Sequence, residues 1–164
     1  MVRIAVFGDT HVPSRADTIP EWVREEVSRA DHAIHTGDFD SPEAFEAVQD
    51  FAEGDLTAVR GNMDPDLGLP DVEVLDIEGT KLVLTHGTGD LASYERRVTD
   101  IAREEGGEEA TAIAGHTHQA TDTTVEGTRL LNPGSATGAD PAPTATMFVL
   151  AIEDGTIEVS RHEE

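Results

Sequence analysis

The stretch Ala114-Gly115-His116-Thr117-His118 closes an apolar run that begins at Ala110, and this pattern predicts a strand that ends in a loop. Two imidazoles separated by one residue on an opening turn can reach two points only a few ångströms apart, as a pair of neighbouring metal ions requires. An isolated His-x-His pair is more often a surface or turn feature. The residues at the ends of the other predicted strands decide between these interpretations.

The sequence predicts alternating strands and helices in the first half of the chain and mostly hairpins in the second half. Strands are expected at 2–7, 32–35, 56–60 and 110–114, and helices at 18–30, 41–54 and 91–102. A capping box from Thr18 to Glu21 is expected to open the first helix, and Ser41-Pro42 the second. Hairpins are expected at 71–78 with 81–85, 121–125 with 128–131, and 146–152 with 156–160. This order predicts an α/β (α+β-like) pair of mixed sheets with helices outside, in one domain over 1–164.

The charge of the chain restricts its function. The 164 residues carry a formal net charge of −23, from 34 acidic and 11 basic side chains, and Lys81 is the sole lysine. We interpret this excess as halophilic adaptation to a very salty interior, where counterions screen charges over a few ångströms. An acidic surface meant for a basic partner is the alternative. A nucleic-acid partner is disfavoured, because no stripe of basic and aromatic residues is present.

Other classes are excluded by what the composition lacks. The chain has no cysteine, so disulfides and thiolate metal sites are excluded. No apolar segment approaches the length of a membrane span, and the apolar start at 2–7 is too short for a secretory signal. We therefore expect a cytoplasmic protein without membrane association.

Metal-binding side chains follow the ends of five predicted strands. Roughly 24 to 30 residues, about one strand plus its return connection, separate successive members of the set Asp9, Asp38, Asn62, His86 and His116. Loops at the carboxyl ends of parallel strands are where binding sites gather. Asp and Asn after strand-end glycines are also ordinary turn residues, but that explanation does not account for four of the seven histidines at these ends.

His11 and His118 each lie two residues beyond another candidate ligand, which brings the expected set to seven nitrogen and oxygen ligands from five loops. One carboxylate shared by two ions would give each ion four protein ligands. Asp38 is the expected bridge, because it lies centrally among the loops and its two oxygens can each face a different ion.

Five short motifs give the chain a resemblance to a known family. In chain order they are Gly8-Asp9-Thr10-His11, Gly37-Asp38, Gly61-Asn62, His86 and Gly115-His116-Thr117-His118. With these motifs the chain resembles the calcineurin-like metallophosphoesterases. Its compactness and its Asn132-Pro133-Gly134-Ser135 loop look most like the small bacterial and archaeal phosphodiesterase branch. The resemblance implies a sandwich of two mixed sheets flanked by helices.

The resemblance also implies two divalent metal ions as cofactors. One ion would be held by Asp9, His11, Asp38 and His118, and the other by Asp38, Asn62, His86 and His116. Ligands of these types without sulfur suit Mn, Ni, Fe, Co or Zn, and we expect manganese first. Two ions roughly 3.5–4 Å apart can share a hydroxide and clamp phosphate oxygens during an in-line displacement. We therefore expect a phosphodiesterase acting on a small-molecule phosphate ester, with Asp38, Asn62 and His86 in catalysis.

Two positions depart from the family pattern. Many members have His directly after the Gly-Asn pair, placed to protonate the leaving oxygen, but here that residue is Met63, which has no proton to give. A positioned acid contributes about 10²–10⁴-fold, so we expect a preference for good leaving groups or a proton from water. Thr88 is the second departure, because the branch often has another imidazole there.

Several other polar residues allow two interpretations each. Arg60 is a catalytic candidate that could reach a substrate phosphate bidentately, or it could form a structural ion pair. Asp64 could orient a loop or a ligand histidine, or cap a turn. Asn132 and Ser135 could border the substrate, although Asn-Pro-Gly is also a good turn. We interpret His35 as a packed strand residue.

Two other functions stay open at the level of sequence. A related eukaryotic trafficking-complex scaffold keeps this fold without catalytic competence, so a non-catalytic metal-binding interaction scaffold is one alternative. A phosphomonoesterase, which would differ only in pocket shape, is the other. The oligomeric state is open as well, a homo-oligomer included.

Overall fold

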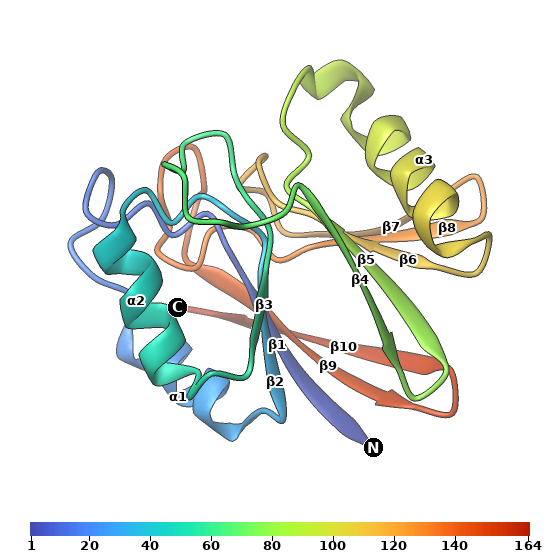
Figure 1. Cartoon of the computed structure of the whole chain (residues 1–164), viewed down its shortest axis with the longest axis horizontal. Helices are drawn as coiled ribbons and strands as arrows, with labels where there is room; N and C mark the ends of the chain where they lie inside the picture. The colour runs from blue at the N-terminus through green and yellow to red at the C-terminus, as the bar shows by residue number, and fades with distance from the viewer.

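Two five-stranded sheets form the centre of the computed structural model, which describes residues 1–164 (Figure 1). The first sheet has the order β10-β9-β1-β2-β3, with strands β1 (Val2–Phe7), β2 (His32–His35), β3 (Leu56–Ala58), β9 (Thr146–Glu153) and β10 (Thr156–Glu163). The second has the order β4-β5-β6-β8-β7, with strands β4 (Val72–Ile77), β5 (Thr80–Thr85), β6 (Thr111–Ile113), β7 (Thr121–Val125) and β8 (Thr128–Asn132). Each sheet mixes parallel and antiparallel pairs.

Helices cover the outer face of each sheet (Figure 1). The first sheet is covered by α1 (Glu21–Arg29) and α2 (Pro42–Phe51), and the second by α3 (Tyr94–Gly106), which follows the 3-10 turn η1 (Leu91–Ser93). No helix combines the length and the apolar character that crossing a membrane requires. The predicted fold, a sandwich of two mixed sheets flanked by helices, is confirmed.

The alternation of side chains along β1 shows why this strand is a continuous apolar run. Ile4 and Val6 point between the sheets, where they pack with residues such as Leu84. Ala5 and Phe7 point the other way and pack beneath α1 and α2. Both faces of β1 are therefore buried, and this burial stabilises the central strand of the first sheet by the hydrophobic effect.

The parallel pairs fix where the loops lie. β1 pairs in parallel with β2, β2 with β3, β5 with β6, and β6 with β8. The carboxyl ends of neighbouring parallel strands share one edge of a sheet, so the loops after β1, β2, β3, β5 and β6 come together at one end of the sandwich (Figure 1). The candidate ligands all lie in these loops.

Two local predictions are wrong. Helix α1 begins at Glu21 with Pro20 at its N-cap, and no side chain caps it. A capping box would need Thr18 at the N-cap and Glu21 three residues into the helix, but Pro20 is extended and Glu21 is the first helical residue. The third helix is expected from residue 91, but α3 begins at Tyr94, and Leu91 lies in the preceding 3-10 turn η1 with 64% of its surface exposed.

Helix α2 offers a test of these capping assignments. The Ser41 hydroxyl accepts a hydrogen bond from the Ala44 N–H (3.1 Å) and donates one to the Val12 carbonyl (3.2 Å). Ser41→Ala should therefore lower the free energy of unfolding by about 1–2 kcal/mol, measured by urea denaturation at constant high salt. Thr18→Ala is the matched control, expected to change it by less than about 0.5 kcal/mol. Equal losses in both variants would contradict the assignment.

Candidate metal centre

The first group of candidate ligands is a compact cluster in the loops at one end of the sandwich. Ligand atoms of the buried residues Asp9, His11, Asp38 and His118 all lie within 4.8 Å of one another. His11 Nε2 is 3.2 Å from His118 Nε2 and 3.4 Å from Asp38 Oδ2. His118 Nε2 is 3.6 Å from Asp9 Oδ1. Four donors from three different loops therefore face one point, as a four-ligand metal site requires.

The cluster also passes a chemical test for a cation. Asp9 Oδ1 is buried and has no hydrogen-bond partner in the protein. A buried carboxylate oxygen without a partner is costly, and a bound cation beside it would remove that cost. The imidazole nitrogens and carboxylate oxygens of the set are ligands that first-row divalent metals accept. The residues present thus fit a divalent metal ion.

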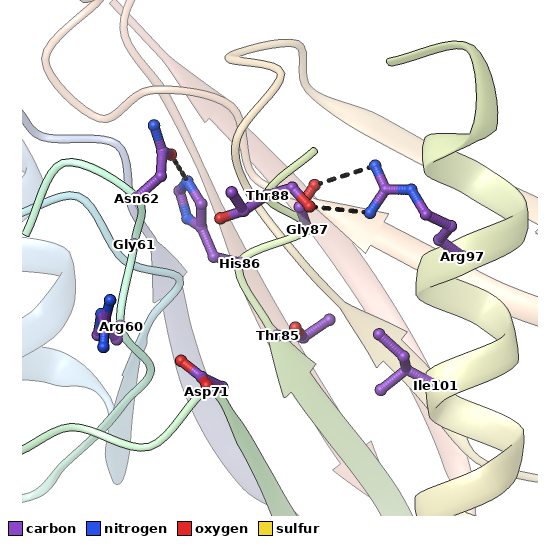
Figure 2. Close-up of a pocket in the computed structure, with 10 residues that line it drawn as sticks. All are labelled: Arg60, Gly61, Asn62, Asp71, Thr85, His86, Gly87, Thr88, Arg97 and Ile101. Atoms are coloured by element: carbon purple, nitrogen blue, oxygen red, sulfur yellow. Dashed lines mark hydrogen bonds between the residues drawn. The ribbon is translucent and has the colours of Figure 1, made fainter. Parts of the chain in front are cut away.

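The second group lies next to the first and is looser. His86 Nε2 is 3.2 Å from Asp38 Oδ2 and 3.0 Å from Asn62 Oδ1, the contact drawn in Figure 2. Its distance to Asp9 Oδ1 is 3.8 Å. The His116 ring is only half-buried, and its centroid is 5.2 Å from that of His86. The structure therefore brings Asp38, Asn62 and His86 together and places His116 beside them.

Asp38 occupies the position between the two groups. Its Oδ2 lies 3.4 Å from His11 Nε2 in the first group and 3.2 Å from His86 Nε2 in the second, and its Oδ1 accepts a hydrogen bond from the Met63 N–H (2.9 Å). This central placement is the one the sequence predicted for a bridging carboxylate. The assignment of each ligand to one of two ions stays a prediction.

Several ligands lie on unusual backbone. The φ angles are positive at Asp9 (47°), His11 (46°), Asp38 (66°), His116 (76°) and His118 (63°). Residues other than glycine avoid this region at a cost of roughly 1–2 kcal/mol each, and such strain gathers at functional sites. The tight turn of the loop after β1 lets Asp9 and His11, two residues apart, both reach the same cluster.

One glycine shows how close the loops come. A Cβ atom at residue 115 would lie 2.5 Å from Thr36 Oγ1 and 2.9 Å from Asp9 Oδ2. Real side chains do not tolerate such distances, so the Gly115 backbone can approach these groups only because it has no side chain. This approach lets the next residue, His116, donate its backbone N–H to Asp9 Oδ2 (3.0 Å).

Burial and neighbouring charges shift the pKa values of the central groups. Burial raises the pKa of Asp9 to about 7, against the opposing effect of His86. Burial also disfavours the charged form of Asp38, but its hydrogen bond and charge interaction with His86 lower its pKa to about 2. For His86, burial is outweighed by the hydrogen bond to Asp38 and the charge of Asp9, which raise its pKa to about 9. Without a bound cation, the second proton of His86 supplies positive charge between the two carboxylates, and a metal ion at Nε2 would take the place of that proton.

The second nitrogen of each buried ligand histidine is held by an acceptor. His86 Nδ1 donates to the Thr36 carbonyl (2.7 Å), and His118 Nδ1 donates to the Ala139 carbonyl (2.9 Å). Because carbonyl oxygens only accept, these bonds place the proton on Nδ1 and leave Nε2 facing the basin. His11 differs, since its Nδ1 faces the carboxylate of Asp40 at 2.9 Å.

Asp40 is a functional residue that the sequence reasoning missed. Its carboxylate is nearly buried, bonds His11 and also accepts from the Ser14 hydroxyl. A carboxylate behind a ligand imidazole fixes the ring and makes it more basic. The only signal in the sequence is its place two residues after Asp38, and nothing there indicates that the loop after β1 folds back onto it.

The Asp64 side chain holds the loop after β2, which carries Asp38 and Asp40, by bonding the backbone N–H groups of that loop. Its two carboxylate oxygens accept hydrogen bonds from the N–H groups of Asp38 (2.9 Å), Phe39 (2.7 Å), Asp40 (3.0 Å) and Gly61 (2.8 Å). Of the two interpretations offered by the sequence, the structure favours orientation of a neighbouring loop. Asp64 therefore ties the loop after β3 to the loop that carries Asp38.

Three other polar side chains considered above, those of Asn132, Ser135 and His35, are buried. Asn132 is buried and donates to the Gly115 carbonyl (3.1 Å), and buried Ser135 donates to the Asp9 carbonyl (2.7 Å). Asn132 Oδ1 also accepts from the Gly134 N–H (2.9 Å), as the turn interpretation predicts, and a role at the substrate stays a prediction. His35 packs in the core against Phe39, at a ring distance of 3.7 Å, as expected of a strand residue. Burial lowers its pKa to about 3.

Comparison with known proteins identifies the family. A family model for the calcineurin-like phosphoesterase superfamily domain matches residues 2–155. The chain belongs to the calcineurin-like phosphoesterase superfamily. A probable metallophosphoesterase of Methanocaldococcus jannaschii is 35% identical, with 92% of this chain and 76% of the relative covered. Another, of Methanothermobacter thermautotrophicus, is 34% identical, with coverages of 82% and 77%.

A solved structure adds a metal to the comparison. Vps29 of Entamoeba histolytica, crystallised in complex with zinc, has a TM-score of 0.73 and 29% identity to this phosphoesterase, over 98% of each chain. The family membership and the cluster of Asp and His side chains together support a metal-dependent phosphoesterase that binds a divalent metal.

A polar pocket of about 390 Å³ adjoins the centre of this phosphoesterase (Figure 2). Asn62 and His86 form the side of the pocket that is shared with the candidate ligands. Arg60 also lines it and makes no ion pair in the structure, so the structural ion pair considered for it is absent. Across the pocket, the Arg97 guanidinium donates to the carbonyls of Thr88 (2.9 Å) and Gly87 (3.4 Å).

Replacing Asp40 tests whether this carboxylate supports the metal ligand His11. Asp40→Asn removes the charge but keeps an acceptor, and Asn tolerates the positive φ of 83° at this position. We expect divalent metal affinity to fall by about 10–100-fold, measured by titration calorimetry with Mn²⁺ and with Zn²⁺. Asp66→Asn, which removes one charge from an exposed turn, is the control. Equal affinities for Asp40→Asn and the wild type would contradict the assignment.

Proposed function

We propose that the protein is a dinuclear metal-dependent phosphodiesterase that hydrolyses a small-molecule phosphate ester. The observation that carries this proposal is Asp38 Oδ2, which lies 3.4 Å from His11 Nε2 and 3.2 Å from His86 Nε2. One carboxylate oxygen within reach of two imidazoles that come from different loops is the arrangement expected of a ligand shared by two ions. We also propose that residues 1–164 act as one domain, in the cytoplasm.

The seven candidate ligands divide into two overlapping sets. The first ion would be held by Asp9, His11, Asp38 and His118, and the second by Asp38, Asn62, His86 and His116. We propose manganese for both positions, and zinc is the alternative that the zinc-bound Vps29 structure supports. When bound, such ions supply Lewis-acid activation of the phosphate ester and of a water molecule.

The surrounding residues bind and orient the ester. The positive charge of two divalent ions exceeds the negative charge of Asp9 and Asp38, so the centre attracts phosphate within a chain of net charge −23. Arg60 borders the pocket with its guanidinium unpaired, and we propose that it binds a phosphate oxygen there. Asn62 has an amide N–H₂ besides the oxygen that faces His86, and this group would donate to the same phosphate.

Substitution of the proposed bridge tests turnover. Asp38→Asn should lower kcat on an aryl phosphodiester by at least about 100-fold, since even partners behind a metal ligand change activity by about 10–100-fold. The assay follows release of the phenol product in molar KCl with divalent metal added, and the metal content of the protein is measured in parallel. Asp66→Asn, an exposed acidic residue, is the control expected to keep full activity.

A second candidate is a non-catalytic metal-binding scaffold, which the similarity to Vps29 favours. The same experiment separates the two functions. Two bound metal ions with no hydrolysis that depends on Asp38 would support the scaffold. Faster hydrolysis of phosphomonoesters than of diesters would instead indicate a phosphomonoesterase.

The missing general acid gives a further test. Met63 follows Asn62, is 48% exposed and has no proton to donate to a leaving alkoxide. Met63→His should raise kcat on alkyl diesters, which need protonation, by about 10–100-fold relative to aryl diesters. Met63→Gln is the control, because Gln is polar but does not titrate. No relative gain on alkyl diesters for the His variant would contradict a missing acid at this position.

A further inference from the structure

The pocket beside the candidate metal centre has four polar side chains that no part of the protein uses. Neither the guanidinium of Arg60 nor the carboxylate of Asp71 has a hydrogen-bond or ion-pair partner, and the same holds for the hydroxyls of Thr85 and Thr88. Ile101 is the single hydrophobic residue in the lining. A group that binds here therefore meets free donors and acceptors on several sides of the pocket (Figure 2).

The same pocket has no aromatic surface. The aromatic side chains of the chain lie elsewhere: Phe7, Phe39 and Phe148 are buried in the core, Phe45, Phe51 and Trp22 pack against the cluster beneath α1 and α2, and Tyr94 is buried. Nucleobases and aryl groups are bound in proteins by stacking on aromatic rings or by apolar contact. The pocket offers no Phe, Tyr or Trp ring and only one hydrophobic side chain, Ile101, so such groups would gain little from entering it.

The wall of the pocket is held in place before any ligand binds. The Arg97 guanidinium donates to the carbonyls of Thr88 (2.9 Å) and Asp90 (2.7 Å), and its Nε donates to Ser93 Oγ (2.9 Å). These bonds connect helix α3 to the loop after β5 and fix the backbone of Thr88. A preformed wall lowers the entropy cost of binding a small polar group.

From these observations we propose that the pocket binds a small polyhydroxylated, non-aromatic alcohol group of the phosphate ester, of the glycerol or sugar class. The ester phosphate would lie at Asn62 and His86, which adjoin the pocket, and hydroxyls of the alcohol would bond Asp71 and Thr88. The volume of about 390 Å³ is within the range of small-ligand sites. The inference rests on the proposed phosphoesterase function and names its substrate class.

Binding to the metal-loaded protein tests the pocket without requiring turnover. Glycerol 1-phosphate and propyl phosphate share the phosphate and the three-carbon chain and differ in two hydroxyls. We expect glycerol 1-phosphate to bind about 10-fold more tightly by titration calorimetry, since each added hydrogen bond contributes roughly 0.5–1.5 kcal/mol. Equal affinities, or tighter binding of phenyl phosphate than of glycerol 1-phosphate, would overturn the proposal.

Variants locate the effect. Thr88→Val and Asp71→Ala should each reduce the affinity ratio of glycerol 1-phosphate to propyl phosphate by about 2- to 10-fold. Thr124→Val, on the exposed face of the edge strand β7, is the matched control and should keep the ratio. An unchanged ratio in both pocket variants would place the hydroxyls elsewhere and overturn the proposal.

The outcome is distinguishable from that of the proposed function. If no diester is hydrolysed but glycerol 1-phosphate binds more tightly than propyl phosphate, the phosphodiesterase proposal fails and the pocket assignment stands. If aryl diesters are hydrolysed and the two monoesters bind with equal affinity, the phosphodiesterase proposal stands and the pocket assignment fails.

Discussion

Two carboxylates buried among the loops at one end of the sandwich are the constraint on which this site depends. Asp9 and Asp38 are almost fully inaccessible to solvent, so water cannot solvate their charge there. The structure surrounds them with imidazole nitrogens from three loops, of which His86 gains a raised pKa of about 9 by bonding Asp38. Metal-binding character follows from this arrangement, because a divalent ion would supply the same positive charge from the centre of the cluster.

The acidic character of the chain extends into the support of the site. Asp64 holds the loop that carries Asp38 by accepting four backbone N–H groups, and Asp40 holds His11 by its second nitrogen. Acidic side chains therefore serve as loop supports as well as candidate ligands here. This use of short carboxylates suits loops with positive φ, where Asp is one of the few residues tolerated besides glycine.

The pocket beside the centre has a different chemistry. Two arginines line the pocket. The Arg97 guanidinium donates hydrogen bonds to carbonyls of the loop after β5, whereas the Arg60 guanidinium makes no bond with another side chain. One arginine thus builds the wall and the other is free to bind an anion, although both have the same charge. Only the hydrogen-bond partners of each guanidinium distinguish the two roles.

Much of the fold could be predicted because local patterns and tertiary burial agree. The apolar run of β1 is buried on both faces, and Ser41 caps α2 as its position before Pro42 indicates. The prediction fails where two local signals compete, as at Thr18, whose capping box is displaced by extended Pro20. The sequence left Asn132 and Ser135 with two interpretations, substrate contact or a turn, and did not predict that both side chains bond backbone carbonyls of other loops.

The sequence by itself determined which side chains reach the site, since the spacing of Asp9, Asp38, Asn62, His86 and His116 places each just after a strand. Only the tertiary structure decided how they meet. It placed the His116 ring beside that of His86, and it made Asp40 the partner of His11. The physical reason is that ligand type and strand period are local properties of the chain, whereas contact between loops depends on how two separate sheets pack against each other.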